Sequence, residues 1–471
     1  MAKGRRVLIV GAGASGLAAA VAAARCGALV TVLEHMETAG KKLLVTGNGH
    51  CNYTNTALSP RHYHGDAALI ASVLSRFDTE ACLRFFETLG VYSKIRRYGY
   101  DDGGYVYPAS GEAASVRDAL LREAEGLGVH LIYGCTPLSL SQCSDINTAA
   151  NSSAPLYLAQ TRQGSFEAEA VILASGSNAA PQTGSDSSLY PVLRALGIPF
   201  KTFRPALCQI NCREPWMSVL KGVRAEAKVI LSVCMPEPAE REGEETAFSG
   251  GKPACFEENK NQTPAADKVI CSAFGEVQFN ETGVSGIPVF QLSRFVPLFF
   301  AEEKQRKRAL KAEVQPLMEP EAECGRDRKQ TARKEKPACG LKLTLDFAPR
   351  TEAEELQKLI EMLVQKGQGL CGLLPHKLAR LLREQETTAA AIARRLKAFE
   401  LTPTGTGGFA SAQCCSGGIP AEALLPSLEL KNWKGLYAAG ELLDVDGDCG
   451  GYNLHWAFAT GVLAGTAAAL S

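Results

Sequence analysis

The sequence lacks an excess of charge of either sign, and it lacks a uniform apolar run. Its 471 residues contain 50 Lys and Arg and 50 Asp and Glu. No global field therefore favours nucleic acid or a membrane, although a basic patch still acts over a Debye length of ~8–10 Å. Residues 7–30 are apolar, but glycines divide them into a β-branched run and an Ala-rich run. This pattern indicates strand, turn and helix, so we expect a cytoplasmic protein without a signal peptide or membrane span.

The sequence also lacks any Cys-x-x-Cys pair. Its 16 cysteines are scattered without zinc-ligand spacing, and Cys414 and Cys415 are adjacent. We therefore expect no metal site and interpret the cysteines as reduced thiols, most of them small buried residues.

The length predicts two or three domains, and the pattern changes near residue 200. Before it, strands and helices alternate, as expected of a parallel sheet covered by helices. These elements are predicted at 7–10, 16–26, 29–34, 66–76, 79–89, 112–127, 129–134 and 171–175. After it come strands at 227–233, 275–279 and 341–347, helices over 351–398, and a final strand and helix at 435–440 and 453–469. The polar stretches 235–268 and 302–340 are interpreted as surface excursions or partly disordered insertions.

A glycine motif carries the first functional signal. Gly11, Gly13 and Gly16 follow a strand and open a helix, as in turns that hold a dinucleotide pyrophosphate. Glu34 ends the second strand, where an acid receives the adenosine ribose hydroxyls. A carboxylate there repels a 2′-phosphate, which excludes NADP from this site and leaves NAD or FAD. The alternative is a structural turn followed by an incidental Glu.

Two longer motifs resemble a known family. Residues 40–55, GKKLLVTGNGHCNYTN, and residues 435–461, GLYAAGELLDVDGDCGGYNLHWAFATG, resemble signatures of the BaiN/RdsA-type NAD(P)/FAD-dependent oxidoreductases, also called aminoacetone-oxidase-family FAD-binding flavoproteins. Weaker similarities follow in family order at 104–110, 171–177, 275–286 and 412–419.

The resemblance implies an α/β protein that binds FAD in a Rossmann-type domain of the glutathione-reductase type. An inserted β-barrel-like domain and a small helical insert complete it. The implied boundaries are 1–199 and 415–471 for the FAD domain, 200–349 and 399–414 for the β-rich domain, and 350–398 for the helical insert. The cofactor-binding residues expected from the motifs together are Gly11, Gly13, Ala14, Ser15, Gly16, Glu34, Lys42, Leu43, Gly47, Asn48, Gly49, Cys51, Asn52, Ala174, Ser175, Gly176, Gly440, Glu441, Gly451, Tyr452 and Asn453.

The sequence departs from the family at His50, Ser177, Cys449 and His455, where Arg, Gly, Thr and Gln are usual. The catalytic acid is not assigned; His455 and Tyr452 are the candidates, with Tyr105 and Tyr107 beside them, and for each the alternative is a packing or hydrogen-bonding residue. For His455 the alternative is a helix residue that hydrogen-bonds a loop carbonyl. Cys449 is a candidate redox-active residue, and the alternative is that it is simply a small residue without redox activity. The acidic loop 441–448 is explained by FAD binding in the family motif, and the alternative is a metal site.

The sequence contains no second dinucleotide turn. NAD(P)H, as a transient reductant, would therefore share the substrate face of the flavin, which predicts ping-pong kinetics. The resemblance implies reduction of a conjugated C=C bond, either in ribosomal RNA uridine or in a steroid-like small molecule. Basic runs at 304–308, 326–329 and 332–336 are compatible with contacts to RNA phosphates, and the alternative is solvated surface, because acidic residues are interspersed. Of the two substrates we favour RNA, since a housekeeping role requires no special metabolism. An FAD-fold binding module without turnover and an NAD-only dehydrogenase remain alternatives.

Overall fold

The computed structural model describes residues 4–97, 103–143, 156–234, 267–314 and 340–471. The chain forms two compact units. Unit 1 joins Met1–Cys208 to Gly407–Ser471, and unit 2 is Gln209–Thr406. In the described part of the chain, no helix is long and apolar enough to cross a membrane.

A five-stranded parallel sheet forms the centre of unit 1, with strand order β21-β11-β1-β2-β7. Its strands are β1 (Arg6–Val10), β2 (Leu29–Leu33), β7 (His130–Ile132), β11 (Ala170–Leu173) and β21 (Leu436–Ala438). The central strand β1 is buried along almost its whole length, because its apolar run is covered on both faces. The strand from the C-terminal part of the chain thus completes a sheet begun at the N-terminus.

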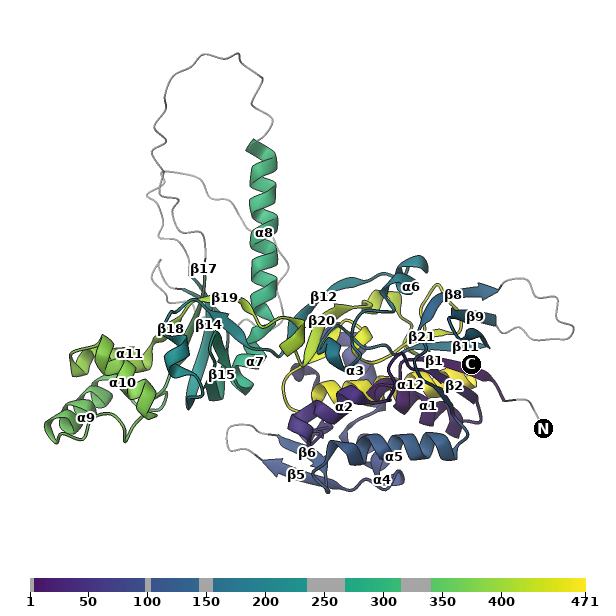
Figure 1. Ribbon diagram of the computed structural model, residues 1–471, viewed down its shortest axis with the longest axis horizontal. Helices are drawn as coiled ribbons and strands as arrows, with labels where there is room; N and C mark the ends of the chain where they lie inside the picture. The colour runs from purple at the N-terminus through teal and green to yellow at the C-terminus, as the bar shows by residue number, and fades with distance from the viewer. Residues whose placement is uncertain (1–3, 98–102, 144–155, 235–266, 315–339) are drawn as a thin grey trace, which may run out of the picture. The chain divides into compact units, whose positions relative to one another are not determined.

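Helix α1 (Ala14–Arg25) lies beside α12 (Tyr452–Leu470), so the purple start and yellow end of the chain meet in Figure 1. Small residues allow this close approach. A Cβ on Gly461 would lie 2.3 Å from Ser15 O, and one on Gly465 would lie 2.3 Å from Ala19 O. The Ala- and Gly-rich patterns of the two helices are therefore explained by their contact with each other.

The remaining described elements of unit 1 surround this core. The helices are α2 (Lys41–Val45), α3 (Ala67–Arg76), α4 (Thr79–Thr88), α5 (Ala113–Gly126) and α6 (Tyr190–Ala195). Antiparallel strands form four small sheets: β3 (Thr54–Asn55) with β6 (Gly104–Pro108) and β5 (Ser93–Arg97); β8 (Pro137–Cys143), β9 (Leu156–Thr161) and β10 (Gly164–Ala168); β12 (Lys201–Ala206) with β20 (Cys414–Gly418); and β4 (Tyr63–Gly65) with β22 (Val445–Gly447). All strands and helices predicted in this unit are confirmed to within two residues at each end.

Unit 2 contains a seven-stranded antiparallel sheet in the order β18-β17-β14-β15-β16-β13-β19. Its strands are β13 (Ile210–Cys212), β14 (Arg224–Cys234), β15 (Lys268–Phe279), β16 (Gly283–Ser285), β17 (Gly340–Asp346), β18 (Phe399–Leu401) and β19 (Pro403–Thr406). Burial alternates along β17, where Leu341, Leu343 and Leu345 enter the core. The β-barrel-like closure of this sheet stays a prediction.

Five helices are described in unit 2: α7 (Ile287–Ser293), α8 (Phe295–Val314), α9 (Ala353–Gln365), α10 (His376–Gln385) and α11 (Ala389–Lys397). The last three confirm the helices predicted over 351–398. Helix α8 corrects the interpretation of the polar stretch 302–340 as an excursion, because its first part, to Val314, is helical and rich in good helix formers. The rest of that stretch, and nearly all of 235–268, lie outside the described residues.

Candidate active site

The glycine turn lies between β1 and α1. Gly11 N donates to Leu33 O at 2.8 Å, and a Cβ on Gly16 would lie 1.8 Å from Gly11 O, so the turn tolerates no side chain there. The space beside Gly13 is open, and no side chain caps α1. The first N–H groups of α1 therefore border a space suited to a phosphate.

Glu34 is buried at the end of β2. Its Oε2 accepts from Ala12 N at 2.7 Å, and its Oε1 accepts from Met36 N at 2.8 Å and lies 3.2 Å from His35 Nδ1. Burial acts to raise the pKa of Glu34, but the hydrogen bonds and the His35 charge outweigh it, so this pKa is lowered. Glu34 thus remains an anion that holds the glycine turn, with lone pairs left for a ribose hydroxyl.

An ion pair connects the two motifs. Glu441, in a short 3₁₀ turn, receives Lys42 Nζ at 2.7 Å and Ser177 Oγ at 3.0 Å, both on Oε2. All three side chains belong to segments that the sequence places far apart. Nearby, Gly440 approaches Ser15 so closely that a Cβ would lie 2.4 Å from Ser15 Oγ.

The turn after α2 is formed by left-handed residues. Gly47, Asn48 and Cys51 have φ of 54°, 55° and 56°. Cys51 is fully buried, and burial raises the pKa of its thiol to about 12, so it is not a thiolate nucleophile.

Asn52 and Gly451 come together from the two motifs. Asn52 Oδ1 is buried, and none of the described residues donates to it. A Cβ on Gly451 would lie 2.8 Å from this atom and 2.6 Å from Thr54 O. A buried acceptor without a donor beside a glycine is what a bound heterocycle with an N–H edge requires.

At the start of α12, the two predicted cofactor contacts Tyr452 and Asn453 have different surroundings: one is buried and the other hydrogen-bonds the preceding loop. Asn453 Oδ1 accepts from Gly447 N at 2.9 Å and its Nδ2 donates to Gly447 O at 2.8 Å, so Asn453 closes the preceding loop. Tyr452 is buried. No side chain caps α12, whose N-cap is Gly451.

His455 is wholly buried inside α12. Its Nε2 donates to Phe77 O at 2.9 Å, so its Nδ1 accepts from the Thr54 hydroxyl at 2.8 Å. Burial lowers the pKa of His455 to about 4. This geometry favours the interpretation of His455 as a helix residue that hydrogen-bonds a loop carbonyl, rather than as a proton donor.

Comparison with known proteins identifies the family. The family model described as "HI0933-like protein Rossmann domain" matches residues 5–467. The chain belongs to the HI0933-like family. HI0933-like proteins are FAD-dependent oxidoreductases, which confirms the predicted family, Rossmann-type α/β fold, FAD and redox activity.

Curated members of the HI0933-like family match nearly the whole chain. The 3-dehydro-bile acid delta(4,6)-reductase of Clostridium scindens is 34% identical and covers 98% of this chain and 99% of its own. The ribosomal RNA dihydrouridine synthases of Haemophilus influenzae and Escherichia coli are 24% and 25% identical, each over 96% of this chain and over 96% and 95% of their own chains.

The acidic residues of the loop 441–448 have partners within the protein. Asp444 receives Lys201 Nζ at 2.8 Å and Gly417 N at 3.0 Å, while Asp448 contacts His62 and His64. Among the described residues, no group of His, Cys, Asp and Glu is arranged to hold a metal.

Two sets of polar residues near the site were not expected from the sequence: Ser177, and the pair His62 and His64. Ser177 was noted only as a departure from the family, yet it donates to Glu441. His62 and His64 were not expected at the site: His62 ends a 3₁₀ turn (Pro60–His62) and His64 lies in β4, so no regular periodicity links them.

Proposed function

We propose that this protein reduces a C=C bond conjugated to a carbonyl group, with NAD(P)H as the electron source. The observation that supports it is the meeting of the two motifs at Asn52 and Gly451, in the same unit as an FAD-type glycine turn. The names of the relatives describe two reactions of one kind: reduction of a bile acid at its delta(4,6) bonds, and formation of dihydrouridine in ribosomal RNA. Both add two hydrogens across a C=C bond.

Different residues would bind different parts of the cofactor. The α1 N-terminus at Ala14, Ser15 and Gly16 would bind the pyrophosphate, and Glu34 the adenosine ribose. Lys42 and Glu441 would orient the ribityl chain, while Asn52 Oδ1 would accept from the pyrimidine edge of the ring. When bound, FAD supplies hydride transfer. The other predicted contacts remain proposals too: Gly11, Gly13, Leu43, Gly47, Asn48, Gly49, Cys51, Ala174, Ser175, Gly176, Gly440, Gly451, Tyr452 and Asn453.

The kinetic order follows from the single dinucleotide turn. Without a second Rossmann turn in the sequence, NAD(P)H and the substrate would occupy the same face of the ring in succession. We therefore expect parallel double-reciprocal lines, whereas intersecting lines would contradict this order. A cytoplasmic location, where NAD(P)H is made, is part of the proposal.

A conjugated 3-keto steroid acid is the first substrate to test, because the bile-acid reductase is the more similar of the two kinds of relative. The steroid acid thus comes before ribosomal RNA, whereas the sequence alone favoured RNA. Uridine in ribosomal RNA is the second candidate, supported by two relatives of nearly full coverage.

The test starts with the purified protein. Its flavin is released and identified, and the holoprotein is then mixed anaerobically with NADH or NADPH. We expect bleaching of the flavin absorbance, followed by its return when a 3-keto-4,6-diene steroid acid is added. Bleaching without return, combined with loss of a ribosomal dihydrouridine on gene deletion, would select the RNA candidate. A flavin that neither nicotinamide reduces would favour a binding module without turnover.

A further inference from the structure

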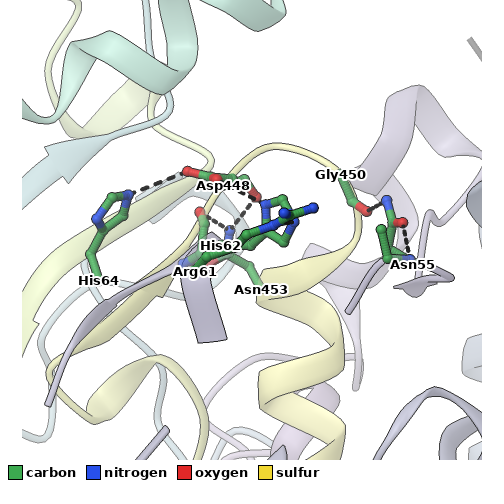
Figure 2. A network of polar contacts seen from close by, with 9 residues as sticks. Asn55, Arg61, His62, His64, Asp448, Gly450 and Asn453 are labelled. Carbon is green, nitrogen blue, oxygen red and sulfur yellow. Dashed lines mark hydrogen bonds and ion pairs between the residues drawn. The ribbon is translucent and has the colours of Figure 1, made fainter. Parts of the chain in front are cut away.

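Two histidines of unit 1 contact one carboxylate. His62 Nδ1 lies 3.3 Å from Asp448 Oδ2, and His64 Nε2 lies 3.3 Å from Asp448 Oδ1. Figure 2 shows the two imidazole rings on opposite sides of the carboxylate. We call these three residues the His–Asp cluster.

The backbone fixes the His–Asp cluster from both sides. Strands β4 and β22 pair with Asp446 opposite His64, and Asp448 N donates to His62 O at 2.8 Å. Asn453 Nδ2 lies 3.4 Å from Asp448 O and closes the same loop. The pairing of β4 with β22 and the bond from Asp448 N to His62 O therefore hold the Asp448 backbone beside both histidines.

The hydrogen bonds define the tautomer of His62. Arg61 Nε donates to His62 Nε2 at 3.2 Å, so Nε2 is an acceptor. A neutral imidazole has one donor and one acceptor, so Nδ1–H donates to Asp448. A carboxylate orients the imidazole of a catalytic triad in the same way, through Nδ1–H. In His62 the other nitrogen, Nε2, accepts from Arg61 in this structure.

The cluster is connected to the loop that meets Asn52. The His62 ring stacks on Tyr452, with centroids 4.4 Å apart and planes 11° apart, and Tyr452 directly follows Gly451. The side chains of His62 and Asp448 are 18% and 22% exposed, which suits exchange of protons with water.

Two other ionisable groups near this loop, His455 and Tyr63, are poor donors. Both ring nitrogens of His455 are occupied in the interior. Burial raises the pKa of Tyr63 well above its ordinary value, and Tyr63 donates its hydroxyl hydrogen to Tyr452 O at 3.0 Å.

We propose that His62, oriented by Asp448, gives the substrate its proton in the reaction proposed above, on which this inference rests. One carbon of the C=C bond takes a hydride, with its electron pair, from the reduced cofactor. The other carbon takes the proton from Nε2 of the His62 imidazolium. The C=C bond becomes a single bond, the cofactor is oxidised, and the imidazole regains a proton from water. Arg61 must leave Nε2 for this, because two donors cannot face each other.

The test compares holoenzyme variants in single turnovers. Wild type, His62→Gln, Asp448→Asn and His130→Gln are reduced with NAD(P)H and mixed with the steroid acid probe. We expect His62→Gln to slow flavin reoxidation by about 10²–10⁴-fold, the usual contribution of a general acid. Asp448→Asn slows it less. FAD content, thermal midpoint and reduction by NAD(P)H stay unchanged, and exposed His130 on β7 is the matched control.

A second readout does not depend on turnover. In ¹⁵N-histidine spectra of the oxidised holoprotein, the signal lost in His62→Gln is expected to show the Nδ1–H tautomer, and Asp448→Asn is expected to change it. A signal of the Nε2–H tautomer would overturn the proposal.

The outcomes separate the two proposals. If wild type is reduced by NAD(P)H but neither the steroid acid nor uridine-containing ribosomal RNA reoxidises it, the proposed function fails and takes this inference with it. If wild type turns over and His62→Gln turns over equally fast, only the role of His62 is overturned.

Discussion

Unit 1 and unit 2 differ in what they bury. Among the described residues, buried ionisable side chains such as Glu34, Asp446 and His455 occur in unit 1, whereas the buried polar residues of unit 2 are Ser232 and Ser293. Burying a polar group costs free energy unless it finds partners, and unit 1 supplies them. Both units have an apolar core, and unit 1 in addition buries ionisable groups together with their partners.

The largest effect is expected at the glycine turn of unit 1. A side chain at Gly16 would meet Gly11 O at 1.8 Å from its Cβ, which β1 and α1 cannot relieve without moving apart. Gly16→Val should therefore abolish flavin binding and cost more than about 3 kcal/mol of stability. Flavin content and thermal unfolding measure this. Gly126→Ala, at an open position on α5, is the control; a flavin-replete Gly16→Val protein would break the comparison.

The next effect concerns the core of unit 2. Phe399 is fully buried against Phe279, Phe347 and Trp216. Phe399→Ala should destabilise unit 2 by about 3–5 kcal/mol through lost packing and a cavity. Urea unfolding measures the lost stability, and native-state hydrogen exchange should show that the faster exchange is confined to unit 2. The flavin content of unit 1 should be retained at 25 °C. Equal loss of flavin would contradict the division of roles.

A smaller effect is expected at the ion pair of unit 1. The Glu441 side chain is 16% exposed, and Lys42→Met leaves its carboxylate with the hydrogen bond from the Ser177 hydroxyl. Loss of a hydrogen bond to a charged group costs about 1.5–3 kcal/mol, or roughly 10–100-fold in FAD affinity. Titration of the apoprotein with FAD measures this. Lys221→Met, whose partner Glu281 is mostly exposed, should leave the affinity unchanged; equal losses would contradict the expectation.

The sequence predicted local features better than distant ones. The order of β1, α1 and β2 follows from periodicity and glycine spacing, and so does Glu34. No local pattern contained the pairing of His62 with Asp448, 386 residues away, because the two residues meet only through the pairing of the neighbouring strands β4 and β22. The helical start of the polar stretch 302–340 was missed, since charge content was given more weight than helix propensity.

His455 gives the smallest expected effect and the sharpest test of how unit 1 uses a buried ionisable group. His455→Gln, which restores the residue usual in the family, keeps a donor and an acceptor for Phe77 O and the Thr54 hydroxyl. At neutral pH we expect nearly unchanged stability and turnover. His455→Leu should cost about 1–3 kcal/mol, because both partners lose their hydrogen bonds. A proton donor would instead lose its activity in both variants.

The pH dependence of stability distinguishes the same two roles without turnover. Burial lowers the pKa of His455 from 6.5 to about 4, so between these values the unfolded chain binds a proton that the folded chain does not. The free energy of unfolding is therefore full above pH 6.5 and falls on acidification, by up to roughly 3 kcal/mol from this group. His455→Gln removes this contribution, so its stability should decline less than that of wild type between pH 6.5 and 4. Parallel curves from urea unfolding would mean that His455 has the same pKa in the folded and the unfolded chain, and would return His455 to the list of proton donors.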